Sequence, residues 1–224
     1  MKKSYLSLIV ATSLVMPMSA SAFKVGDIVV RGGFATVSPD DASSNVFLDD
    51  TDLGFNLSVD SNTQLGLTVA YFFADNMNIE VLAATPFKHD VNFGVNDPLG
   101  TGNQLGEVTH LPPTLTVNYY LGDNQTTFKP YVGVGFNYTV FFDEEFSAEN
   151  VNAGLANLSL DNSFGLAAQL GADFMLNERW FVNGAIRWID IDTEATFDLN
   201  GTPGSVGSIQ IDPWVYSLSI GYRF

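Results

Sequence analysis

Few residues in this sequence could carry out acid–base or nucleophilic chemistry. Among its 224 residues there are two histidines and no cysteine. His89 ends a predicted strand, and His110 lies in the motif HLPP. No serine has an obvious histidine and acid in its sequence context, so we expect a protein that is not an enzyme. The leading catalytic alternative is a lipid-modifying barrel hydrolase that uses His89 or His110.

Metal, cofactor and nucleic-acid chemistry are not indicated either. Without cysteine, a thiolate metal site, a disulfide framework and a lipid-anchored cysteine are excluded. The 25 acidic residues outnumber the 9 basic ones, so no basic surface is available to neutralise the phosphates of a nucleic acid. Acidic clusters occur around residues 40–52, 143–149 and 190–198, but no D-x-[DN]-x-[DN]-G loop is present. We therefore predict a solvated acidic rim and no metal site or cofactor; the alternative is that these clusters hold calcium or magnesium.

Several charged residues lie inside segments in which large apolar side chains alternate with small or polar ones. In QLGLTVAYFF (64–73), for example, large apolar side chains alternate with small or polar ones. This period of two is typical of strands. Eight segments of the chain show it, namely 25–37, 64–73, 77–87, 114–121, 132–140, 163–174, 180–188 and 209–224.

The connections between these segments alternate in length. They cover residues 38–63, 74–76, 90–109, 122–124, 143–162, 176–178 and 193–208, which is long, short, long, short, long, short, long. Outer-membrane barrels have this pattern, with long extracellular loops and short periplasmic turns. The bulky, aromatic-rich face would then contact lipid, and the small polar face would line the lumen. We predict an all-β fold, an eight-stranded antiparallel transmembrane β-barrel of the outer-membrane type. A soluble sandwich or lipocalin-like barrel is the alternative.

The first 22 residues have the features of a secretory signal peptide. Lys2 and Lys3 precede an apolar stretch, and Ala20-Ser21-Ala22 fits a cleavage site. The apolar stretch is shorter than the roughly 20 residues that a spanning helix needs. We therefore assign residues 1–22 to the signal peptide and residues 23–224 to the barrel. An even number of strands places both ends of the barrel in the periplasm.

Several long stretches resemble one known family. They are HLPPTLTVNYYLG (110–122), PYVGVGFNYTVFF (130–142), LSLDNSFGLAAQLGADFML (158–176), DIDTEATF (190–197) and IDPWVYSLSIGYRF (211–224). Together they are similar to the signature segments of the OmpW family of bacterial outer-membrane proteins, from about Lys24 to Phe224. The resemblance implies a barrel with an unusually apolar lumen, thought to pass small hydrophobic molecules. Some members are receptors for bacteriocins, so the loops are candidates for binding a bacteriocin or a phage, although the first two loops carry no recognisable motif.

The positions that face the lumen predict two layers. Lower in the barrel, Arg31, Glu80, Asp173 and Arg187 need partners in a narrow, low-dielectric interior, and we expect them to form an ionic plug. Nearer the loops, inward parity predicts an apolar cup that could bind a hydrophobic molecule, lined by Leu82, Ala84, Pro86, Pro112, Phe141, Ile189, Pro213 and Val215. The alternative for both layers is that they only fill the barrel.

A hydrophobic molecule in such a cup would not pass a charged plug. Prolines near the outer strand ends, among them Pro86 and Pro112, each remove a ladder N–H. We therefore predict transport across the outer membrane with lateral release into the membrane. The alternative is a structural or receptor barrel with a filled, non-conducting lumen that is recognised through its loops.

The last strand ends on an aromatic residue. Leu218, Ile220, Tyr222 and Phe224 occupy alternate positions that would face lipid. They also resemble the C-terminal signal read by the outer-membrane assembly machinery. The predicted partners are therefore outer-membrane lipid and lipopolysaccharide, small hydrophobic molecules and the assembly machinery.

Overall fold

The computed structural model describes residues 22–40, 42–43, 45–49, 51–54, 57–93, 99–122 and 126–224. Apart from Ala22, the predicted signal peptide lies outside these residues. Among the described residues, no helix is long and apolar enough to cross a membrane.

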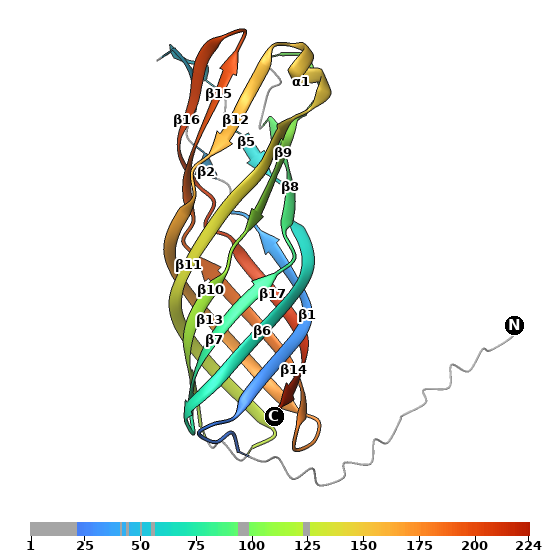
Figure 1. Ribbon diagram of the computed structural model, residues 1–224, viewed down its shortest axis with the longest axis vertical. Coiled ribbons are helices and arrows are strands. Elements are labelled where there is room, and N and C mark those ends of the chain that lie inside the picture. Colours follow the sequence, from blue (N-terminus) through green and yellow to red (C-terminus); the bar gives the residue numbers. More distant parts are fainter. Residues whose placement is uncertain are drawn as a thin grey trace, which may run out of the picture.

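Eight antiparallel strands close into a barrel (Figure 1). The ring is complete because β10 and β11, at the two ends of the strand path, pair over Thr114–Tyr120 and Tyr131–Asn137. This confirms the predicted fold class and the predicted number of barrel strands. The last of them begins at Trp214 and not at residue 209, because Ile209 and Gln210 belong to β16 (Thr202–Gln210). The barrel strands are β1 (Ile28–Ser38), β6 (Asn62–Ala74), β7 (Met77–Ala84), β10 (Thr114–Tyr120), β11 (Phe128–Phe146), β13 (Ser163–Met175), β14 (Trp180–Ile189) and β17 (Trp214–Arg223).

Side chains alternate between the lumen and the outer surface along each barrel strand. On β13 the even-numbered residues are mostly exposed and the odd-numbered ones are buried. The exposed set is apolar and large: Val134 is 68% exposed, Phe164 70% and Leu218 63%. A continuous band of this kind fits a barrel solvated by lipid. The alternation also places Arg31, Glu80, Asp173 and Arg187 inside.

The barrel has a turn end and a loop end. Short turns, the C-terminal Phe224 and the described start of the chain lie at the turn end, and the long connections lie at the loop end (Figure 1). At the turn end, Trp180 packs edge-on against Tyr222, with ring centroids 4.8 Å apart, and Tyr222 packs in the same way against Phe224 at 4.7 Å. The side chain of Phe224 is 72% exposed.

The long connections, which we predicted as loops, contain further strands. One set extends the barrel wall beside β11 in the order β9–β8–β5, and the other forms a separate sheet, β12–β15–β16–β3–β4, with β2 beside β16. Their alternation was missed because small and polar residues stand where a membrane strand carries bulky ones. The elements are β2 (Ala42–Ser43), β3 (Val46–Leu48), β4 (Thr51–Asp52), β5 (Leu57–Val59), β8 (Phe87–Phe93), β9 (Gln104–Leu111), α1 (Ala148–Asn152), β12 (Leu155–Leu160), β15 (Asp192–Leu199) and β16 (Thr202–Gln210).

One inward position was predicted wrongly. Pro86 is exposed, whereas its neighbour Phe87 is buried, with 2% of its surface exposed. The reason is that the third predicted strand is interrupted at Thr85 and Pro86, between β7 and β8. The alternation of inward and outward side chains along a strand does not continue in register across such a break.

Candidate functional site

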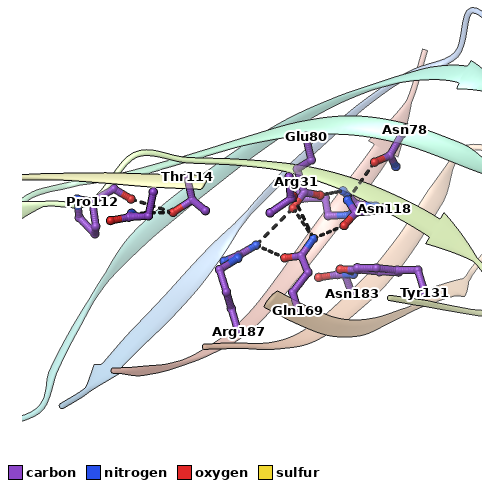
Figure 2. Close-up of polar contacts among 12 residues, drawn as sticks. Arg31, Asn78, Glu80, Pro112, Thr114, Asn118, Tyr131, Gln169, Asn183 and Arg187 are labelled. Carbon is purple, nitrogen blue, oxygen red and sulfur yellow. Dashed lines mark hydrogen bonds and ion pairs between the residues drawn. The ribbon is translucent and has the colours of Figure 1, made fainter. Parts of the chain in front are cut away.

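A network of charged side chains crosses the middle of the lumen (Figure 2). Arg31 Nη1 lies 2.7 Å from Glu80 Oε2, and Arg31 Nη2 lies 3.0 Å from Asp173 Oδ2. Arg187 Nη2 lies 3.2 Å from Glu80 Oε1. The four residues predicted as a plug are thus joined in one buried ionic network. They come from four strands: β1, β7, β13 and β14.

Neutral side chains complete this polar layer. Tyr120 donates its hydroxyl to Asp173 Oδ2 at 2.7 Å, and Asn183 donates to Asp173 Oδ1 at 2.8 Å. Gln169 donates to Glu80 Oε1 at 3.2 Å and also contacts Arg187 and Asn118. Every carboxylate oxygen of Glu80 and Asp173 accepts at least one hydrogen bond. The carboxylates are therefore fully paired, as a buried charge network requires, whereas Nε and Nη1 of Arg187 are buried without a hydrogen-bond partner among the described residues.

Below this layer, an aromatic cluster fills the turn end. Phe23 is fully buried and stacks on Phe72 with ring centroids 4.5 Å apart. Its ring also lies 5.3 Å from the Tyr120 ring and 6.1 Å from that of Phe181. Gly221 leaves room for Phe181, because a Cβ at Gly221 would lie 2.1 Å from the Phe181 ring. We call this aromatic cluster, made of Phe23, Phe72, Tyr120 and Phe181, the stopper. It was not predicted, since Phe23 precedes the first alternating strand.

Above the charged network, apolar side chains form a floor. Three predicted cup residues, Phe141, Ile189 and Val215, are buried in this cluster, and Ala84 packs against it. Leu82, Pro112 and Pro213 are buried as well. Leu82 lies lower, however, beside Arg31 and Glu80 around a small cavity of about 20 Å³. The predicted cup is therefore mainly a packed apolar layer.

The larger cavity lies between this floor and the strands of the loop end. Its volume is about 360 Å³, and its walls are almost entirely apolar. Of the predicted cup residues, Phe141 lines it. Most of its lining comes from the strands that we had expected to be loops, including Val46, Val91, Leu105, Leu160, Ala195 and Val206. The signal in the sequence that could have located this cavity is the alternation of Thr193, Ala195, Phe197 and Leu199.

Two histidines lie together in the cavity wall. The Nε2 atoms of His89 and His110 are 3.0 Å apart, and Nδ1 of His89 lies 2.5 Å from the backbone carbonyl oxygen of Asp60. The His110 ring packs between Phe87 and Phe141, with centroids at 5.6 and 5.8 Å. Burial, and then the neighbouring His89, lower the pKa of His110 to about 3. The pair lies on β8 and β9, beyond the eight barrel strands.

The barrel wall is interrupted beside this pair. The β7–β10 ladder ends at Leu82 and Thr114, and the β8–β9 ladder starts at Phe87 and His110. No backbone pairing joins residues 83–86 to residues 111–113, all of which the structure describes. Each edge remains bonded to its other neighbour: Thr85 N–H donates to Leu65 O at 2.9 Å, and Tyr138 N–H donates to Pro113 O at 3.1 Å.

Comparison with known proteins agrees with this architecture. The chain matches the model of the OmpW family over residues 24–224. It is 47% identical over 203 residues to outer membrane protein W of Vibrio cholerae, covering 91% of each chain. It is 42% identical to outer membrane protein W of Escherichia coli K12 over the full length of both. The chain belongs to the OmpW family.

The solved structures extend this relationship to the fold. The crystal structure of the outer membrane protein OprG from Pseudomonas aeruginosa superimposes with a TM-score of 0.84 at 43% identity, over 91% of this chain and 98% of OprG. Membership of the OmpW family confirms the predicted resemblance and identifies the chain as an outer-membrane barrel.

Proposed function

We propose that this barrel takes up small, uncharged hydrophobic molecules at its loop end and releases them sideways into the membrane. The observation that carries the proposal is the apolar cavity of about 360 Å³. No charged side chain lines it among the described residues. Burying about 200 Å² of apolar ligand surface there contributes roughly 5 kcal/mol at about 25 cal/mol per Å².

The filled lumen argues against a route straight through the barrel. A molecule leaving the cavity downward would meet the apolar floor, then the network around Glu80, and then the stopper around Phe23. Displacing the charged network would leave buried charges without partners, which is strongly unfavourable. An apolar molecule cannot replace the ion pairs and hydrogen bonds that those charges would lose.

The wall interruption supplies the alternative exit. It lies directly beside His110 and Phe141 of the cavity wall, and on its other side it borders residues of the apolar outer band. Leu65 and Tyr138, which flank it, are 58% and 47% exposed. Pro86, Pro112 and Pro113 supply no N–H to a ladder, so this stretch cannot pair fully.

The proposal includes an orientation. The loop end faces the cell exterior and its lipopolysaccharide layer, and both ends of the barrel lie in the periplasm. The even number of strands and the short turns next to Phe224 support this orientation.

Uptake of a hydrophobic fluorescent probe into proteoliposomes tests the cavity. Ala195 is 5% exposed and lines the cavity, so Ala195→Trp fills it and is expected to reduce uptake severalfold. Ala168→Trp adds the same bulk on the lipid-facing side of β13 and serves as the matched control. Equal uptake by wild type and Ala195→Trp would instead support the structural or receptor barrel with a filled lumen.

Reversible cross-links test the lateral exit, because the chain contains no native cysteine. Lys88 and Thr109 are paired just above the interruption, and Val81 and Leu115 just below it. A disulfide at either pair restrains the edges, and uptake is expected to fall on oxidation and recover on reduction. Val134 and Ala168, paired in the intact wall, provide the control cross-link. If neither test pair changes uptake while Ala195→Trp lowers it, the cavity binds ligand but the exit lies elsewhere.

A further inference from the structure

A buried hydrogen-bond acceptor has no partner in the wall of the cavity. Nδ1 of His110 makes no hydrogen bond to any described residue, although the atom is buried. His110 and its neighbour His89 both line the cavity. Buried polar atoms are nearly always paired, so an exception calls for an explanation.

The hydrogen bonds of the pair determine which nitrogen carries each proton. A carbonyl oxygen can only accept, so His89 Nδ1, 2.5 Å from Asp60 O, must carry a hydrogen. In a neutral ring the other nitrogen, Nε2, then has a lone pair. His110 Nε2, 3.0 Å away, must therefore be the donor. This leaves a lone pair and no hydrogen on His110 Nδ1.

Among the described residues, the rest of the cavity lining offers no competing polar anchor that is both buried and unpaired. Thr193 already donates its hydroxyl to the carbonyl oxygen of Asp161 at 2.6 Å. Gln210 is exposed. No described lining residue is charged, so a carboxylate or ammonium group in the cavity would lose its hydration without gaining an ion pair.

We propose that His110 is the polar anchor of the cavity and accepts, through Nδ1, a hydrogen bond from the hydroxyl group of an otherwise apolar ligand. The ligand class is therefore a neutral alcohol or phenol. This inference rests on the proposed function and adds the chemical group that the cavity selects. The neutral state follows from the lowered pKa of His110, which keeps the acceptor available at ordinary pH.

The location of His110 explains how a ligand can reach Nδ1. Because the atom is shielded, its ring or the following backbone must shift. Residues 111–113 directly follow His110 and have no pairing across the wall interruption. The segment that must move is therefore the one least held by the wall. Binding of a hydroxyl group at His110 would then act at the edge of the proposed exit.

Two matched probes test the anchor on the full chain in lipid nanodiscs. 2-Naphthol carries a hydroxyl, and 2-methoxynaphthalene has the same aromatic body without a donor. After correction for partitioning into nanodiscs without protein, we expect 2-naphthol to bind roughly 3- to 10-fold more tightly. His110→Phe preserves the aromatic stack and should remove the difference. Phe141→Leu, a control in the same wall, should weaken both probes alike.

Histidine ¹⁵N spectra of the wild-type protein keep the test independent of any variant's folding. The Nδ1 resonance of His110 is expected to shift with 2-naphthol and to stay in place with 2-methoxynaphthalene. Equal binding of both probes with no such shift overturns the anchor and leaves hydrophobic uptake standing. Binding of neither probe overturns the proposed function, and the anchor with it.

Discussion

Arg31 on β1 and Asp173 on β13 are joined across the lumen by two hydrogen bonds. Nε donates to Oδ1 at 3.3 Å and Nη2 donates to Oδ2 at 3.0 Å. The strands β17 and β14 separate β1 from β13 in the wall, so this pair links distant parts of the ring. A two-point contact of this kind fixes orientation as well as distance.

Removing one charge of this pair should destabilise the barrel. Asp173→Asn keeps the size of the side chain but leaves Arg31 with Glu80 as its remaining ionic partner. Breaking a buried pair in this way typically costs about 3–5 kcal/mol. Urea unfolding in lipid vesicles measures the change. Asp143→Asn, at an exposed position, should change stability by less than about 0.5 kcal/mol; an equal loss in both variants would contradict the role of the network.

A methyl group at Gly221 should disturb the stopper at the turn end. Its Cβ would lie 2.1 Å from the Phe181 ring, so Gly221→Ala must displace that ring from Phe23. Overpacking of this kind costs about 1–3 kcal/mol. Unfolding and the aromatic NMR signals of Phe181 report the change. Gly184→Ala, where no atom lies within 4 Å of the new Cβ, is the matched control. An unchanged Phe181 signal in Gly221→Ala would show that the ring is not held as described.

The histidine pair should make stability depend on pH. The folded-state pKa of His110 is lowered to about 3 from its usual 6.5, so the unfolded chain takes up a proton first as the pH falls. The contribution is fully present above about pH 6.5 and is lost between about pH 6.5 and 3, by up to about 1.4 kcal/mol per pH unit. Wild type should therefore lose stability relative to His110→Phe as the pH is lowered from 8 to 4. A difference that stays constant over this range would mean that His110 is protonated alike in both states.

Deleting Phe224 should reduce assembly more than it reduces the stability of barrels already formed. The side chain is 72% exposed and contacts Tyr222 at its edge, so little buried surface is lost. The amount of folded protein in the outer membrane measures assembly, and unfolding of the purified barrel measures stability. Phe224→Tyr, which keeps an aromatic end, is expected to assemble normally. Normal surface levels of the truncated chain would count against a C-terminal assembly signal.

The barrel strands could be predicted because lipid on one side and a narrow lumen on the other impose the same alternation on each. That rule also placed Arg31 and Asp173 inside. It failed at Pro86, where the strand is interrupted, and it could not locate Phe23, which enters the turn end from outside the ladder. The cavity was predicted too low because the strands that line it, at the loop end, were not recognised. Strands in water do not need bulky outer side chains, so their alternation is weaker than that of the barrel strands. The pairing partners of the loop-end strands depend on tertiary contacts, which the alternation of residues along one strand does not reveal.

The strands at the loop end also limit where proteases can cut. Between Arg31 and Lys129, Lys88 is the single lysine or arginine, and no other basic residue occurs between Lys129 and Arg179. Lys88 lies within the β8–β9 ladder and forms an ion pair with Glu107. The basic residues after it lie in barrel strands, as Lys129 and Arg187 do, or near the turn end. A trypsin-like enzyme approaching the loop end therefore meets one cleavable bond, held in an extended ladder that its active site cannot readily accept.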